Sequence, residues 1–117
     1  MSTDHRKLSA FTLADEFAVS IYTITRNFPP EERYGIRSQI RRAAVAVPTN
    51  IVEGCARDSD REHNRYFEIA LGSAREAIYL LGLSDRLELI DRGKTEEIVN
   101  LGNRVAAALS ALKKSIP

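Results

Sequence analysis

The stretch VPTNIVEG, at residues 47–54, decides how the middle of this chain folds. It continues an alanine-rich run that predicts a buried helix, but Pro48 cannot donate a hydrogen bond to the carbonyl of Ala44 and crowds it. Counting the apolar seam in steps of three and four places Asn50 at a core-facing position. A buried amide without partners costs about 1–3 kcal/mol. We therefore expect a helix that bends at Pro48, holds Asn50 in the polar niche that the bend opens, and ends at Gly54.

Two interpretations of this niche follow from its neighbours. Glu53 lies three residues beyond Asn50, and Ser73 and Glu76 form a similar pair on the next predicted helix. If these two helices pack antiparallel, the two pairs face each other. Together with Pro48 they then form an internal polar network that fixes the register of the helices. The alternative interpretation is a pocket for a small ligand; we adopt the network as the working prediction.

Working outward from this stretch, prolines and glycines divide the chain into four amphipathic segments. Apolar residues recur at helical spacing over residues 9–28, 30–54, 60–87 and 94–114. Phe28-Pro29-Pro30 ends the first segment because proline cannot continue a helix. No segment has the alternation of a β-strand. The sequence therefore predicts one all-α domain, residues 1–117, folded as an up-and-down antiparallel four-helix bundle.

The composition limits the classes of function. The chain is 44% apolar and 28% charged, as expected for a globular protein, and its net charge of +1 gives no global attraction to nucleic acid. No apolar run approaches the roughly 20 residues that span a membrane, so we expect no membrane partner. A lone Cys55 and the lack of a secretory signal predict a cytoplasmic location.

The residue patterns of catalysis and metal binding are missing. Four-helix carboxylate metal sites use Glu-x-x-His on two helices, and neither His5 nor His63 lies three residues after a glutamate. Zinc spacings and glycine-rich phosphate loops do not occur. A lone cysteine near a helix end more often packs as a small residue than acts as a nucleophile. We therefore predict no enzymatic activity, no metal and no cofactor.

A line of arginines is the best candidate for a binding site. Arg33, Arg37 and Arg41 are four residues apart, which predicts one helix face, and Arg42 is adjacent. Guanidinium groups at this spacing suit the phosphates of RNA or DNA. The alternative is a solvated face paired with carboxylates such as Glu32. A homo-oligomer would repeat the arginines and strengthen a weak surface.

The third predicted helix has apolar side chains beyond its core stripe. These residues are Tyr66, Ile69, Leu80, Leu83 and Leu87. Gly72 and Gly82 in the same helix each cost about 1 kcal/mol relative to alanine, which favours a role in close packing. The helix either touches both neighbours in its own bundle or presents a second apolar face to another subunit. The second interpretation predicts a protein-interaction module, with or without nucleic acid.

Two long segments, FPPEERYGIRSQIRRAAVAVPTNIVEG and YFEIALGSAREAIYLL, follow a specific family pattern. The matching positions are Phe28, Pro29, Glu32, Tyr34, Gly35, Gln39, Arg42, Ala43, Ala44, Pro48, Asn50, Ile51, Glu53, Gly54, Ala70, Gly72, Ser73 and Glu76. In these positions the chain resembles the bacterial 23S rRNA intervening-sequence, or S23-type, family of four-helix bundles. The match covers most of residues 17–87. Ala46 and Val52 depart from it, since the family commonly has serine and alanine there.

The resemblance implies a homo-oligomer, because family structures form pentameric rings, and implies no established enzymatic activity. Some family members are encoded within insertions in ribosomal RNA genes. A related protein binds nucleic acid through a strongly basic surface, and this chain, with a net charge of +1, lacks that excess.

Overall fold

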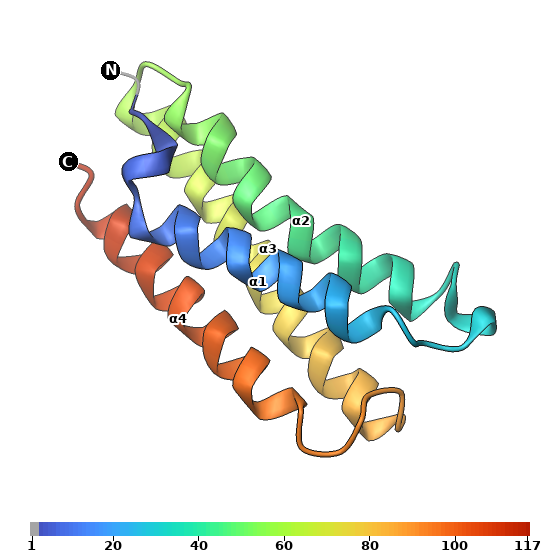
Figure 1. Ribbon diagram of the computed structural model, residues 1–117. Coiled ribbons are helices and arrows are strands. Elements are labelled where there is room, and N and C mark those ends of the chain that lie inside the picture. Colours follow the sequence, from blue (N-terminus) through green and yellow to red (C-terminus); the bar gives the residue numbers. More distant parts are fainter. Residues whose placement is uncertain (1–2) are drawn as a thin grey trace.

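Four α-helices form the protein, which is described here by a computed structural model of residues 3–117 (Figure 1). They are α1 (Ser9–Thr25), α2 (Ile36–Cys55), α3 (Asp60–Arg86) and α4 (Thr95–Lys114), with short 3₁₀ turns η1 (His5–Lys7) and η2 (Pro30–Glu32). Each helix contacts the next one in the chain, and α4 closes the bundle against α1. The predicted all-α four-helix fold is confirmed. The first two residues of the predicted domain lie outside the described part.

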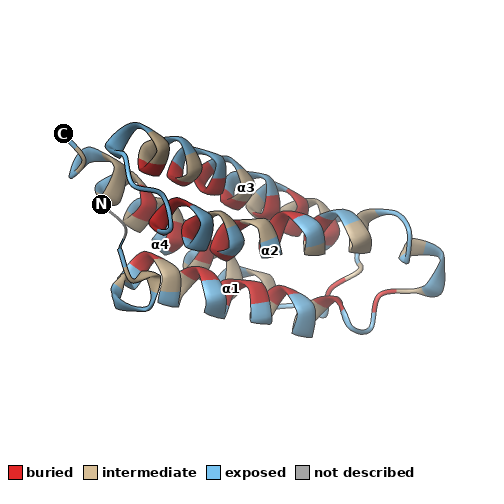
Figure 2. Cartoon of the chain, turned by 90° about the horizontal axis from the view of Figure 1, so that it is seen from above, coloured by how far each residue is buried: buried red, intermediate tan, exposed pale blue. Residues whose placement is uncertain are grey.

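The core fills the space between the inward faces of the helices, as the buried residues in Figure 2 show. Its largest fully buried apolar side chains are Phe17, Ile21, Ile40, Val47, Ile51, Leu81, Val105 and Leu109. Each such side chain contributes about 1.5–3 kcal/mol when it leaves water. The three- and four-residue spacing that predicted the helices is the spacing of this core.

The second helix begins later than predicted. Pro30–Glu32 forms a separate 3₁₀ turn. Gly35 has a non-helical backbone, with φ −105° and ψ −121°, so α2 starts only at Ile36. The predicted helix over residues 30–54 is therefore wrong in its first turns. The first helix likewise ends at Thr25, three residues before the expected end. The Pro29-Pro30 pair ends the first helix early, and the non-helical Gly35 delays the start of the second.

The turn between α2 and α3 is tight and depends on Gly54. A Cβ on this residue would lie 2.9 Å from Phe67 Cε1 and 3.0 Å from Tyr66 Cβ. Only glycine lets the end of α2 approach α3 this closely. Across the same turn, His63 Nε2 is hydrogen-bonded to the carbonyl oxygen of Arg57. These contacts set the register between the two helices.

The two ends of the bundle differ in what they carry. The α1–α2 and α3–α4 connections lie at one end, and the α2–α3 turn, the start of the described chain at Thr3 and the C-terminus lie at the other (Figure 1). The backbone N–H of Thr3 donates to the carbonyl of Cys55 at 2.8 Å, which holds the start of the described chain at the α2–α3 turn.

Candidate nucleic-acid interface

The predicted arginines line one groove, which we call the arginine groove. It has a volume of about 570 Å³ and is lined by Tyr22, Arg33, Tyr34, Arg37, Ser38, Arg41, Arg42 and Val45. Arg37, Arg41 and Arg42 come from α2. Arg33 does not share their helix, contrary to the prediction, because the non-helical Gly35 lies between Arg33 and the start of α2. Arg33 reaches the groove from the segment before α2. No aspartate or glutamate is among the lining residues.

Arg41 joins α2 to α1. Its Nε donates to Thr25 Oγ1 at 2.8 Å, its Nη2 donates to the carbonyl of Tyr22 at 3.1 Å, and its guanidinium lies 4.4 Å from the centre of the Tyr22 ring. A cation at the carbonyl end of α1 is favourable for the helix dipole. Burial, and then the positive charge of Arg37 and Arg26, lower the pKa of Arg41, which stays charged at neutral pH. Arg41 therefore holds the groove together.

The other three arginines have no carboxylate partner. Across residues 3–117, none of the ion pairs involves Arg33, Arg37 or Arg42. Arg42 makes only a long bond to Ser38 Oγ, at 3.4 Å, and the Arg33 guanidinium lies 5.5 Å from the ring centre of Tyr34. The pairing with nearby carboxylates that the sequence allowed is not formed. These positive charges are available to an anion.

Two tyrosines in the groove were missed in the sequence. Tyr34 is 88% exposed and Tyr22 is 42% exposed. Exposed aromatic rings beside guanidinium groups are the parts from which single-stranded nucleic-acid sites are built. One signal was available for Tyr34, because it lies between two of the predicted arginines at a helix break. Nothing in the sequence marked Tyr22, which reaches the groove only because α1 and α2 pack together.

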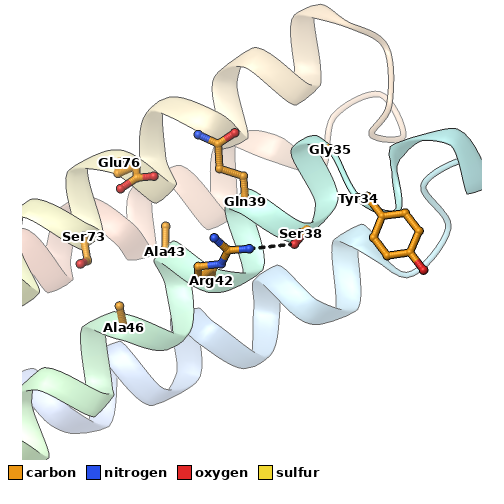
Figure 3. A pocket seen from close by; sticks show the side chains of 9 residues that line it. All are labelled: Tyr34, Gly35, Ser38, Gln39, Arg42, Ala43, Ala46, Ser73 and Glu76. Atoms are coloured by element: carbon orange, nitrogen blue, oxygen red, sulfur yellow. Dashed lines mark hydrogen bonds between the residues drawn. The ribbon is translucent and has the colours of Figure 1, made fainter.

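A second groove runs between α2 and α3, and we call it the α2–α3 groove (Figure 3). It has a volume of about 530 Å³ and is lined by Tyr34, Gly35, Ser38, Gln39, Arg42, Ala43, Ala46, Ser73 and Glu76. Tyr34, Ser38 and Arg42 also line the arginine groove. The two grooves are thus neighbours that share one wall.

The predicted polar network is not formed. Asn50 is half-buried rather than buried, and its Nδ2 donates to the carbonyl of Ala46 within α2 at 2.7 Å. Glu53 is exposed and pairs with Arg57 on its own side of the turn at 2.7 Å. Ser73 and Glu76 instead line the α2–α3 groove opposite Ala43 and Ala46.

The physical reason is the register set at the turn. Gly54 lies against Tyr66 and Phe67, so in an antiparallel pair Asn50 comes opposite Ala70, about one turn before Ser73 and nearly two turns before Glu76. Buried Pro48 lies within α2, which runs on to Cys55. The side chains of Thr49 and Asn50 donate to the carbonyls of Val45 and Ala46, four residues earlier, so both find their partners within α2 and neither bonds the Ala44 carbonyl.

The predicted subunit face on α3 is partly wrong. Leu80 is only 4% exposed and belongs to the core of the bundle, and Leu83 is partly buried against that core. Tyr66 is half-buried, with the guanidinium groups of Arg57 and Arg65 5.1 and 5.5 Å from its ring centre. Helical periodicity gives the angle around α3 but not how far its neighbours extend over that side.

An exposed part of that face remains. Ile69 is 41% exposed, Tyr79 is 60% exposed and Leu87 is 54% exposed. A Cβ added at Gly72 or Gly82 would meet nothing within 4 Å, so neither glycine serves close packing inside this chain. We call Ile69, Gly72, Tyr79, Leu83 and Leu87 the α3 outer face.

Both the sequence and the fold of this chain are similar to those of known proteins. The family model of the 23S rRNA-intervening sequence protein matches residues 6–111, which is most of the chain. The chain belongs to the 23S rRNA-intervening sequence protein family. The resemblance noted in the sequence is confirmed. A solved structure of a protein with unknown function from the S23 ribosomal protein family of Bacteroides thetaiotaomicron is similar, with 29% identity and a TM-score of 0.80 over 90% of this chain and 98% of that chain. Comparison with curated proteins gave no match.

Three further features of this member of the 23S rRNA-intervening sequence protein family concern metal binding, thiol reactivity and membranes. Within residues 3–117, no cluster of three or more histidine, cysteine, aspartate or glutamate side chains could hold a metal ion. Burial, and then the charge of Asp4, raise the pKa of the Cys55 thiol, so this cysteine is a poor nucleophile. No helix in the described part is long and apolar enough to cross a membrane.

Proposed function

We propose that this protein is a non-catalytic homo-oligomer that binds RNA or DNA through the phosphates of the nucleic-acid backbone, which lie in the arginine groove. The observation that carries the proposal is a groove lined by Arg33, Arg37, Arg41 and Arg42 and by no carboxylate. A net charge of +1 spread over the molecule is too small to attract a polyanion. Four guanidinium groups on one groove are a local field, which acts within about 8–10 Å at physiological salt.

The start of α2 adds to this field. Gly35 provides no side-chain cap, and the first turn of α2 contains no acidic residue. The first backbone N–H groups of a helix carry partial positive charge and bind phosphate oxygens well. One carboxylate opposes them, since Glu32 Oε1 lies 3.0 Å from the position of a Cβ on Gly35. The arginines outnumber it.

Self-association through the α3 outer face completes the proposal. Its exposed apolar residues and the unpacked Gly72 suit contact with a second copy of the chain, with Glu76, one turn from both Gly72 and Tyr79, left at the rim of that contact on the side of α2. The expected assembly is the pentamer that the family resemblance implies. Such a ring repeats the arginine groove on every subunit, and several weak contacts on one strand then act together.

The test is salt-dependent binding by the full chain. A labelled 20-nucleotide RNA is titrated by fluorescence anisotropy at about 50 mM and about 200 mM salt. With about three phosphate contacts per groove, from Arg33, Arg37 and Arg42, the slope of log affinity against log salt is expected near −2 for a single strand. Arg37→Ala with Arg42→Ala weakens binding about tenfold or more. The matched control, Arg61→Ala with Arg104→Ala, removes the same charge from exposed positions on α3 and α4 and binds like the wild type. Absence of binding at low salt, or equal loss in both variants, overturns the proposal.

A protein-interaction module without nucleic acid is the second candidate, favoured by the same α3 outer face. Light scattering on the chain gives the assembly mass. Tyr79→Glu is expected to lower that mass, because it places a charge where apolar surface is buried. Val19→Glu is the control, since Val19 is equally exposed, at 62%, on α1. An oligomer that binds no RNA or DNA supports this candidate over the first.

A further inference from the structure

The two grooves that meet at Tyr34, Ser38 and Arg42 differ in chemistry. The arginine groove offers positive charge and aromatic rings, and its other lining residues are Ser38 and Val45. Beyond the shared wall, which carries Arg42, the α2–α3 groove offers hydrogen-bond acceptors: the carboxylate of Glu76, the amide of Gln39 and the hydroxyl of Ser73, above a floor formed by Ala43 and Ala46 (Figure 3). A phosphate chain follows the first groove and is repelled by Glu76 in the second. The second groove therefore suits a neutral group that donates hydrogen bonds.

From this geometry we infer that the α2–α3 groove holds an unpaired nucleobase bearing an exocyclic amine, guanine most favourably, while the adjacent phosphates lie in the arginine groove. The inference rests on the proposed function, because phosphate binding is what brings a base to the shared wall. It adds two properties to that function: a preference for single strands and a preference among bases.

Acceptor chemistry selects the base. A carboxylate accepts from base amines, as glutamate and aspartate accept from cytosine N4. Guanine presents its N1–H and N2–H groups side by side, which matches the two oxygens of Glu76. Uracil has no exocyclic amine, and its single N3–H donor lies between two carbonyl oxygens, which Glu76 repels. The groove volume of about 530 Å³ lies within the range of small-molecule sites.

The exposed ring of Tyr34 favours binding of a single strand over a duplex. Its ring is 88% exposed on the wall that the two grooves share, so a base entering the α2–α3 groove passes beside it. Stacking on an aromatic ring needs an exposed base face, and Glu76 needs an exposed base edge. In a duplex the pairing edges are occupied and the faces are stacked. Single strands, loops and ends offer both.

The experiment uses the full chain and three labelled probes at one low salt concentration. They are a 12-nucleotide uridine strand, the same strand with one central guanosine, and a 12-base-pair duplex. The guanosine strand is expected to bind about fivefold or more tightly than the uridine strand, and the duplex more weakly than either. Glu76→Gln reduces the guanosine-to-uridine ratio toward one, and this ratio is the readout because removing a negative charge tightens binding of every strand. Glu68→Gln, an exposed glutamate elsewhere on α3, keeps the wild-type ratio.

Tyr34→Ala gives a second readout. It is expected to weaken both single strands about tenfold and leave duplex binding and the salt slope unchanged, because a phosphate contact does not use the ring. Equal affinity for guanosine and uridine strands, or a ratio unaffected by Glu76→Gln, overturns the inference and leaves the proposed function standing. Failure of all three probes to bind at low salt overturns both.

Discussion

The Nε of Arg41 donates to the buried Oγ1 of Thr25 at 2.8 Å, and so ties α2 to the carbonyl end of α1. Thr25 Oγ1 in turn donates to the carbonyl of Ile21 at 2.7 Å. An arginine that the sequence assigned to ligand binding is thus the brace of the groove. Its neighbour Arg37 makes no such contact. We therefore assign Arg41 to holding the groove together and Arg37 to binding the ligand.

Arg41→Ala is expected to lower the free energy of unfolding by about 1–3 kcal/mol, because it removes two charge-assisted hydrogen bonds and the contact with Tyr22. Arg41→Lys keeps the charge and loses most of the same stability, since an ammonium cannot reproduce the planar fork. Urea denaturation measures both. Arg37→Ala, the control, changes stability by less than about 0.5 kcal/mol. A larger effect at Arg37 than at Arg41 contradicts this division of roles.

Gly54→Ala is expected to destabilise the protein by about 1–3 kcal/mol, because its methyl group would lie 2.9 Å from Phe67 Cε1. Gly72→Ala is the matched change in the next helix. It adds a methyl group where nothing lies within 4 Å and is expected to stabilise the single subunit by up to about 1 kcal/mol through helix propensity. Thermal unfolding compares the two. Equal destabilisation by both would contradict the tight turn at Gly54.

Asn50 and Glu76 are expected to act independently. Asn50→Ala removes a local hydrogen bond to Ala46 and costs about 0.5–1.5 kcal/mol of unfolding free energy. Glu76→Gln, at an exposed position, costs less than about 0.5 kcal/mol. Because the two side chains do not share a partner, the double variant loses the sum of the two single effects. A coupling energy above about 0.5 kcal/mol in this double-mutant cycle would show that the two side chains interact, as the sequence predicted.

Cys55 is expected to react slowly with a thiol reagent at neutral pH. It is 1% exposed, and burial raises its pKa, so the reactive thiolate is scarce in the folded state. The reaction rate, followed by absorbance, should rise sharply in urea. Fast labelling in the native state would contradict the buried site.

The raised pKa of Cys55 also predicts that the stability of the protein depends on pH. The folded pKa lies above the unfolded value, so the contribution is complete below the unfolded pKa and is lost as the pH rises through the folded one.

Periodicity in the sequence predicted the four helices, their core stripes and the end of α2 near Gly54. It also identified Arg33, Arg37, Arg41 and Arg42, which do share a groove. It failed where the answer depends on position along a neighbouring helix. The spacing assigned Asn50 to the core, but Asn50 is half-buried. It assigned Leu80 to an outer face, but Leu80 is buried in the core.

These failures share a cause. Spacing along one helix gives the direction of a side chain around that helix. Burial is set by which residue of the next helix lies opposite, and that is fixed here by the contact of Gly54 with Tyr66 and Phe67. Tyr22 was missed for the same reason, since it becomes part of the groove only through its contact with Arg41.

The separation of the bundle ends has a practical consequence. Thr3 and the C-terminus lie at the end of the bundle that carries the α2–α3 turn, whereas Tyr34 and the start of α2 lie at the far end, next to the α1–α2 connection (Figure 1). An affinity tag, a fluorophore or a fused enzyme attached at the C-terminus therefore stands at least about half the length of α2 away from both grooves, whose α2 lining residues nearest to Cys55 are Val45 and Ala46. A 20-residue helix spans about 30 Å. The protein can be tethered to a sensor surface through that end with its arginines facing the solution.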